Sequence, residues 1–102
     1  MSQRPDLNKI ATRLYERALE LDSLKFGEFV LSSGQKSSYY FDGRMLSTDP
    51  EGADLISRAF SFVIDESHVD AFGGPSVAAV PIVGSLALRF HLEGKTNTGF
   101  FV

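Results

Sequence analysis

A glycine-rich turn near the end of the chain carries the first residues that could bind a ligand. Gly73, Gly74 and Pro75 follow a short apolar run and precede a segment with helical spacing. In parallel α/β sheets, ligands bind beyond the carboxyl ends of the strands, and unpaired amides at a helix N-terminus attract anions such as phosphate. The turn is neither a complete dinucleotide fingerprint nor a P-loop. Spacing alone therefore favours a tight structural turn over a phosphate site at Gly73 and Gly74.

An aromatic segment between two cations is the second candidate. Residues 39–41 are all aromatic, and they lie between Lys36 and Arg44. Along a strand, successive side chains point to opposite faces, so Tyr40 would point away from its two neighbours. One face could stack on a planar ring while the two cations meet an anionic ligand. The alternative is an aromatic strand packed on a core, with Lys36 solvated and Arg44 paired to Asp42 or Asp49.

The remaining reactive side chains form no catalytic or metal-binding pattern. His68 and His91 flank predicted helices and have no Ser/His/Asp arrangement near them, so we expect surface or capping roles. Asp49 and Glu51 suit a helix start better than an acid/base pair. The chain has no cysteine, which excludes disulfides and thiolate metal sites. We therefore identify no catalytic residue and no metal ligand.

Composition limits the class of protein. The chain has 102 residues, of which 43% are hydrophobic, and this permits one domain with a core. The formal net charge of -3 gives no broad electrostatic case for binding nucleic acid or an anionic membrane. No apolar stretch approaches the roughly 18 residues that span a bilayer. We expect a cytoplasmic globular chain whose partners are neither nucleic acid nor membrane.

The first half of the chain must position the aromatic segment. Apolar residues at helical spacing predict an amphipathic helix over residues 7–21, with Asp6 as its N-cap. Short apolar runs at 26–31 and 38–42, separated by the turn signal at 32–35, predict a β-hairpin.

The second half must position the glycine turn. Thr48 or Asp49 can cap a helix that runs to about residue 65, with Pro50 in its first turn and Glu51 completing a capping box. A strand at 69–72, a helix at 81–92 and a strand at 99–102 complete the chain, and Gly94 stops that helix. The wide apolar arc of the helix predicts that it is well buried.

The strand–helix–strand unit predicts two parallel strands joined by a right-handed crossover. Parallel strands normally lie inside a sheet that is covered on both faces. The apolar edge at residues 99–102 would be bare, and complete proteins protect such edges. We therefore expect a single partial α/β domain: residues 1–47 form a helix and a hood, residues 48–102 begin a parallel sheet, and further sequence follows Val102.

Read in order, three segments resemble the opening of orotate phosphoribosyltransferases. They are Leu24 to Phe29, Leu31 to Arg44 with its run of aromatics, and Ser47 to Gly52. Downstream, the Gly73-Gly74-Pro75 turn with Pro81-Ile82 is similar to the family's first phosphoribosyl-substrate loop. The resemblance spans roughly residues 19–102 and rests on the ordered combination. It implies an N-terminal hood over the beginning of a phosphoribosyltransferase-type parallel sheet.

The resemblance also implies a reaction and a set of site residues. The family transfers ribose 5-phosphate from phosphoribosyl pyrophosphate to orotate in pyrimidine biosynthesis, with magnesium helping to neutralise the pyrophosphate. Tyr40 and Phe41 match the positions that hold the orotate ring. Ser32, Val77 and Ala78 match positions that contact phosphoribosyl pyrophosphate. Many members have lysine where Ser32 and Ala78 stand, so this chain lacks two phosphate cations, although a hydroxyl and backbone amides could serve instead.

The family's mobile basic loop and its acidic ribose-phosphate loop have no counterpart in these 102 residues. In the family the mobile loop serves the neighbouring subunit of a homodimer. The primary reading is therefore an N-terminal fragment of an orotate phosphoribosyltransferase that has no activity alone. The alternatives are a non-catalytic binding or assembly module, such as a truncated paralogue, and a phosphoribosyltransferase for another base. The aromatic hood segment favours orotate over another base.

Overall fold

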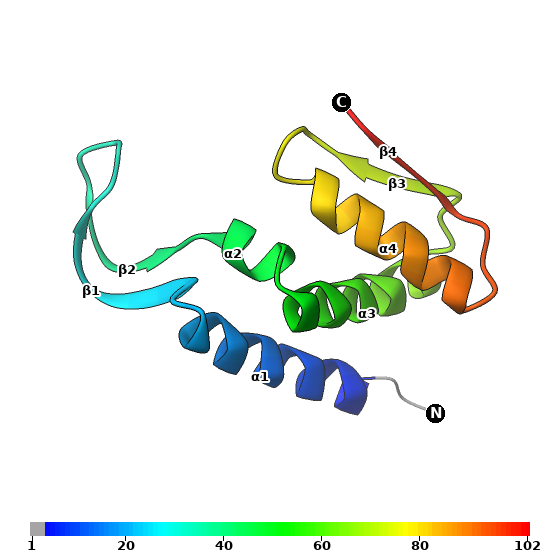
Figure 1. Cartoon of the computed structure of the whole chain (residues 1–102), viewed down its shortest axis with the longest axis horizontal. Coiled ribbons are helices and arrows are strands. Elements are labelled where there is room, and N and C mark those ends of the chain that lie inside the picture. Colours follow the sequence, from blue (N-terminus) through cyan, green and yellow to red (C-terminus); the bar gives the residue numbers. More distant parts are fainter. Residues whose placement is uncertain (1–3) are drawn as a thin grey trace.

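The computed structural model describes residues 4–102, and the side chains of residues 6–64 and 68–102. The molecule is elongated, with extents of 45 × 33 × 23 Å, because a β-hairpin extends away from a body of stacked helices (Figure 1). Helix α3 lies between α1 and α4, and a pair of parallel strands lies against α4. The elements in order are α1 (Arg4–Glu20), β1 (Leu24–Val30), β2 (Lys36–Phe41), α2 (Gly43–Ser47), α3 (Pro50–Ser67), β3 (Ala71–Gly74), α4 (Val80–Leu92) and β4 (Thr98–Phe101).

Helix α1 confirms the predicted amphipathic helix and buries Ile10 and Ala18. It begins earlier than expected. Because the helix already starts at Arg4, Asp6 lies in its first turn instead of capping it, so the prediction for Asp6 is wrong. A carboxylate in the first turn still favours the helix through the helix dipole.

Strands β1 and β2 form the predicted antiparallel hairpin, in which Leu24 pairs with Phe41 and Val30 with Lys36. The turn is closed by two backbone hydrogen bonds of 2.8 Å, from the Leu31 amide to the Gln35 carbonyl and from the Gly34 amide to the Leu31 carbonyl. Gly34 has a φ of +87°, a conformation that favours glycine because other residues have a Cβ. The hairpin is a separate two-stranded sheet and does not pair with β3 or β4.

Helix α3 begins where a capped helix was predicted, and Asp49 is the cap: its carboxylate accepts a hydrogen bond from the Gly52 amide at 2.9 Å. The predicted capping box is not formed. Glu51 is the second helical residue after this cap, and its carboxylate binds Arg13 of α1 instead. Gly52 allows α2 and α3 to approach closely, since a Cβ there would lie 2.0 Å from the Leu46 carbonyl oxygen.

Strands β3 and β4 are parallel and α4 connects them, as predicted. The predicted bounds of β3 are wrong by two residues, because Gly73 and Gly74 belong to the strand and do not follow it. Packing explains this. A Cβ on Gly73 would lie 2.5 Å from the Phe100 carbonyl oxygen, and one on Gly74 would lie 2.7 Å from the Ala79 Cβ.

The hydrophobic core is small, and its buried apolar side chains come from α1, α2 and α4. Phe90 is 1% exposed and packs edge-on against Phe72 with ring centroids 5.3 Å apart, and Leu86 is also buried. The expectation that α4 is buried over a wide arc is only partly met, because Leu88 and Leu92 are exposed. The β4 edge is bare, with Phe100 and Phe101 each more than half exposed. Among the described helices, none is both long and apolar enough to cross a membrane.

Candidate functional site

An apolar groove brings the hood and the glycine-rich loop together. It has a volume of about 460 Å³, within the usual range for ligand pockets. Three residues singled out from the sequence line it: Phe41 at the end of β2, Arg44 in α2 and Ala78 in the loop before α4. The rest of the wall is formed by Gly43, Leu46, Ser47, Ile56, Phe60 and Ile82. Segments almost forty residues apart thus form one surface, and a planar ring could lie against its aromatic side.

Phe41 is held at the groove by its neighbours. It ends β2 opposite Leu24, and its ring lies against Gly43, where an added Cβ would be 3.2 Å from the Phe41 Cε2 atom. Tyr40 does not line the groove; its ring contacts Phe29, with centroids 5.9 Å apart. Residues 39–41 are each about half exposed. Within the described residues the aromatic strand is therefore not packed in a core, which weakens the purely structural reading of this segment.

Arg44 is the cation of the groove, and Asp42 fixes its position. The Arg44 Nε and Nη2 atoms bind the two carboxylate oxygens of Asp42, each at 3.0 Å. These hydrogen bonds raise the pKa of Arg44 and lower the pKa of Asp42. The pairing of Arg44 with a nearby aspartate was the structural alternative from the sequence, and it is present. Arg44 nevertheless lines the groove, and its side chain is 73% exposed.

The loop between β3 and α4 offers free backbone amides. The Ser76 amide donates to the Val102 carbonyl at 2.8 Å, and the Ala79 amide donates to the Pro75 carbonyl at 3.1 Å. Between them, the amides of Val77 and Ala78 have no hydrogen-bond partner among the described residues. These are the two loop residues for which the family resemblance implies contact with phosphoribosyl pyrophosphate. The peptide bond between Ser76 and Val77 is cis.

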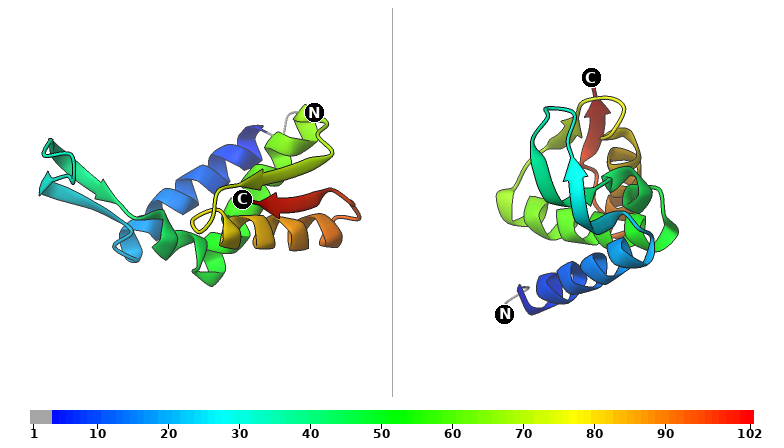
Figure 2. Two further views of the ribbon diagram at one scale, coloured as in Figure 1. Left: turned by 90° about the horizontal axis from the view of Figure 1, so that it is seen from above. Right: turned by 90° about the vertical axis from the view of Figure 1, so that its left-hand side faces the viewer.

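Ser32 and Lys36 lie apart from this groove. Both belong to the outer part of the hairpin, which points away from the helices and from the β3–α4 loop (Figures 1 and 2). Lys36 lines a separate shallow groove on the hairpin together with Phe29 and Ser38. The structure of one chain therefore does not bring Ser32 next to Val77 and Ala78. Gly73 and Gly74 support the loop by allowing close packing, as described above.

An ionic cluster determines how α1, which carries the hood, sits on α3. Arg17 binds both oxygens of Asp49 at 2.8 and 2.9 Å, and Arg13 binds both oxygens of Glu51 at 2.6 and 2.7 Å. Glu20 binds both arginines. The Arg17 guanidinium and the Gly52 amide hold the pKa of Asp49 at about 2. Asp49 and Glu51 are thus structural, as the sequence indicated, and they do not form an acid/base pair.

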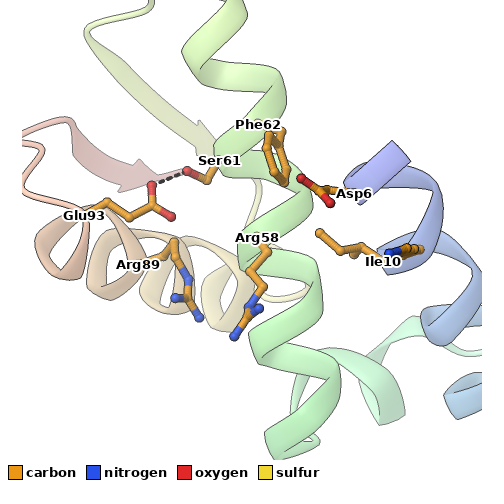
Figure 3. Close-up of a pocket in the computed structure, with 8 residues that line it drawn as sticks. Asp6, Ile10, Arg58, Ser61, Phe62, Arg89 and Glu93 are labelled. Carbon is orange, nitrogen blue, oxygen red and sulfur yellow. Dashed lines mark hydrogen bonds between the residues drawn. The ribbon is translucent and has the colours of Figure 1, made fainter. Parts of the chain in front are cut away.

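A larger cavity, of about 680 Å³, lies between α1, α3 and α4 (Figure 3). Sequence reasoning did not find it, because its charged residues look like solvated helix faces. Three of its charged residues have partners within the chain: Arg58 and Arg89 both bind Asp54, and Ser61 donates to Glu93 at 2.5 Å. These internal pairs engage both arginines and the glutamate of the lining.

The histidines and acidic residues supply no metal centre in the described part of the chain. His68 is the C-cap of α3 and His91 lies in the last turn of α4, so the expected capping and surface roles are confirmed. No group of three or more His, Cys, Asp or Glu residues among those described could hold a metal ion.

Known proteins with similar sequences are orotate phosphoribosyltransferases. The chain is 42% identical over 80 residues to that of Methanopyrus kandleri, covering 78% of this chain and 43% of the relative. It is 36% identical over 90 residues to that of Bradyrhizobium diazoefficiens, covering 88% of this chain and 48% of the relative. The chain therefore spans less than half the length of these relatives. No protein-family model matches it.

Solved structures of orotate phosphoribosyltransferases are also similar to this chain. The orotate phosphoribosyltransferase of Mycobacterium tuberculosis superimposes with a TM-score of 0.74 at 26% identity, over 91% of this chain and 53% of that one. The enzyme of Francisella tularensis gives a TM-score of 0.70 at 27% identity, over 87% and 45% of the two chains. In sequence and in its α/β fold, the chain is similar to the N-terminal part of orotate phosphoribosyltransferases.

Proposed function

We propose that this chain supplies the pyrimidine-facing side of an orotate phosphoribosyltransferase site. The complete enzyme would transfer ribose 5-phosphate from phosphoribosyl pyrophosphate to orotate in pyrimidine biosynthesis, in the cytoplasm and as a homodimer. The observation that carries the proposal is the groove shared by Phe41 and Ala78. It places an aromatic ring from the hood next to the loop whose amides are unpaired, so a base and a phosphorylated sugar can be held side by side.

Each part of the groove suits one part of the substrates. The half-exposed Phe41 ring offers a stacking face for the planar base. The Val77 and Ala78 amides can donate hydrogen bonds to an anionic phosphate without leaving another partner unsatisfied. Tyr40 supports the hairpin through Phe29 and would meet the base only from the other face of β2. Ser32 would act where the hairpin tip meets another part of the complete protein.

Magnesium does not fit a protein-held site here, because the described residues contain no ligand cluster and the carboxylates of Asp42, Asp49 and Glu51 are bound to arginines. We confine its proposed role to the magnesium complex of phosphoribosyl pyrophosphate and assign it no step.

Calorimetric titration tests the proposal. Orotate and phosphoribosyl pyrophosphate should each bind the 102-residue chain, and both should bind together, because the ring and the amides occupy different parts of one groove. In the presence of magnesium, the rate of turnover should not exceed that of a control without protein. Transfer of the phosphoribosyl group needs more preorganised charge than one arginine provides. Binding of neither ligand, or mutually exclusive binding, would contradict the proposed groove.

A second candidate function is a non-catalytic assembly module. The observation that favours it is the bare β4 edge, where Phe100, Phe101 and Val102 are 53%, 58% and 88% exposed. Exposed edge strands pair with other chains. Under this function the chain would bind a full-length orotate phosphoribosyltransferase subunit in a sedimentation experiment but would bind neither substrate alone.

A further inference from the structure

The cavity between α1, α3 and α4 has a basic end and an acidic end (Figure 3). Arg58 of α3 and Arg89 of α4 point towards one end, and the carboxylates of Asp6 and Glu93 lie towards the other. On α4 the separation follows from helix geometry, because Glu93 comes about one turn after Arg89. The two kinds of charge are therefore not mixed along the wall of the cavity.

Lys9 brings a third cation to the basic end. The ion pairs of Arg13 and Arg17 with the start of α3 hold α1 antiparallel to α3. Lys9 is about one turn closer to these ion pairs than Asp6 is, and this places it nearer the level of Arg58. It lines the cavity and has no ion-pair or hydrogen-bond partner among the described residues.

Arg58 and Arg89 share a single carboxylate, that of Asp54. The Arg58 Nε atom donates to one Asp54 oxygen at 3.2 Å, and the Arg89 Nη2 atom binds the same oxygen. The Arg89 Nε atom donates to the Ser57 hydroxyl at 3.1 Å. Both Nη atoms of Arg58 and the Nη1 atom of Arg89 have no hydrogen-bond partner in the part of the chain that the structure describes. Counted with Lys9, three cations face one carboxylate, so positive charge and N–H donors remain for an anion.

We propose that the basic end of this cavity, formed by Lys9, Arg58 and Arg89, binds a phosphate group, either free or as a small phosphate monoester. A phosphate monoester carries close to two negative charges at neutral pH and has three strong acceptor oxygens, which suits an excess of two positive charges from three side chains. Guanidinium groups match the geometry of phosphate oxygens. The Arg89 side chain is only 18% exposed, and partial burial strengthens its attraction to an anion.

This site is separate from the groove of the proposed function. The cavity shares no lining residue with the groove of Phe41 and Ala78. On α4, Arg89 lies nine residues after Val80, and at about 1.5 Å per residue it is far from the loop before that helix. The inference therefore does not depend on the proposed function.

The rest of the wall limits what the phosphate can carry. Ile10 and Phe62 offer apolar contacts, and the carboxylate of Asp6 lies near the Phe62 ring (Figure 3). A second anionic group that extended to the acidic end would meet Asp6 and Glu93. We therefore expect a single phosphate to be preferred, and pyrophosphate to bind no more tightly than phosphate.

A nuclear magnetic resonance titration of the 102-residue chain tests the site. The probes are inorganic phosphate and phenyl phosphate, with sodium chloride at matched ionic strength as the control for screening. Both probes should cause saturable shifts of the Lys9, Arg58 and Arg89 signals. Tighter binding of phenyl phosphate, through contact with Phe62, would identify a monoester as the ligand, and equal affinities would identify free phosphate.

Substitutions on α1 provide matched variants. Lys9→Gln removes the unpaired cation and should weaken phosphate binding about fivefold, the scale of an exposed charge contact. Lys9→Arg keeps the charge and should retain the affinity. Asp6→Asn changes a charge on the same helix and in the same cavity, but at the acidic end, and should not weaken binding. Thermal melting checks that each variant is folded.

Three results would overturn the proposal. They are shifts confined to Val77 and Ala78, an unchanged affinity in Lys9→Gln or a loss that Asp6→Asn equals, and shifts that sodium chloride reproduces. The first result would leave the proposed function intact, because that function itself expects a phosphate at the β3–α4 loop.

Discussion

The hood and the β3–α4–β4 unit are held together by different physical means. In the β3–α4–β4 unit, Gly73 lies close to the Phe100 backbone, Gly99 lies close to side chains of Val83 and Phe72, and Phe90 is almost completely buried. In the hood, the hairpin aromatics are half exposed, and buried Ser23 joins the end of α1 to the base of the hairpin. Helix α1 is tied to the start of α3 by the ion pairs of Arg13 and Arg17. Close packing tolerates little change, whereas exposed ion pairs contribute little individually. We therefore expect the β3–α4–β4 unit to determine stability and the hood to determine ligand binding.

The largest expected effect comes from the core of α4. Phe90→Ala should lower the free energy of unfolding by about 3–5 kcal/mol, since its ring is 1% exposed and packs on Phe72. A chain of this size has little stability to lose, so the variant should be largely unfolded at room temperature. Leu88→Ala, on the same helix but 59% exposed, is the control and should behave like the unsubstituted chain in urea denaturation. Equal midpoints for the two variants would contradict the expected difference between the two regions.

Glycine substitutions in the β3–α4–β4 unit should change the free energy of unfolding by an intermediate amount. Gly99→Ala should destabilise the chain by roughly 1–3 kcal/mol, because its Cβ would lie 2.6 Å from Val83 Cγ1 and 2.8 Å from the Phe72 ring. Gly84→Ala, in α4, has no atom within 4 Å of its Cβ and should stabilise the helix, by up to about 1 kcal/mol. The melting temperature should therefore fall in Gly99→Ala and rise in Gly84→Ala. If both substitutions lower the melting temperature equally, close packing at Gly99 is not the cause.

A hood substitution should act on binding more than on folding. Phe41→Ala should weaken orotate binding by about 1–3 kcal/mol if the ring stacks on the base, which is roughly 5- to 150-fold in affinity. The melting temperature should change little, because the ring is 52% exposed. Phe26→Ala, on the opposite hairpin strand and outside the groove, is the matched control. A loss of melting temperature that parallels the loss of affinity would support the core-packing reading instead.

The smallest effect concerns pH. The pKa of Asp49 is about 2 in the folded chain, whereas its ordinary value is 3.8. The ion pair with Arg17 therefore stabilises the folded chain at pH values above 3.8. This contribution is lost as the pH falls from about 4 towards about 2. Asp49→Asn should retain the helix cap and make the melting temperature less dependent on pH over that interval. An unchanged acid profile in the variant would show that the ion pair does not contribute.

Local patterns predicted most of the elements, because helical periodicity, the hairpin turn and the proline after Asp49 are local signals. Errors arose where the outcome depended on distant residues. Glu51 could complete a capping box, but Arg13, which lies 38 positions away, binds its carboxylate. The limits of β3 were misplaced because the close approach of Gly73 to Phe100 is invisible in a linear sequence.

The site was predicted in part for the same reason. Phe41 and Ala78 were singled out by resemblance, and the fold brings them to one groove. Ser32 was assigned to the same substrate as Ala78, but the hairpin carries it away from the loop (Figure 1). The sequence left two possible partners for Arg44, Asp42 and Asp49, and the structure shows that Asp42 binds it.

The most direct test of the groove is the position of orotate on the chain. Intermolecular nuclear Overhauser effects should connect the single carbon-bound ring proton of bound orotate with the Phe41 ring and the Ala78 methyl group, which both line the groove. Contacts from that proton to Phe29 on the hairpin, or to Phe62 in the cavity of Figure 3, with none to Phe41 or Ala78, would contradict the account.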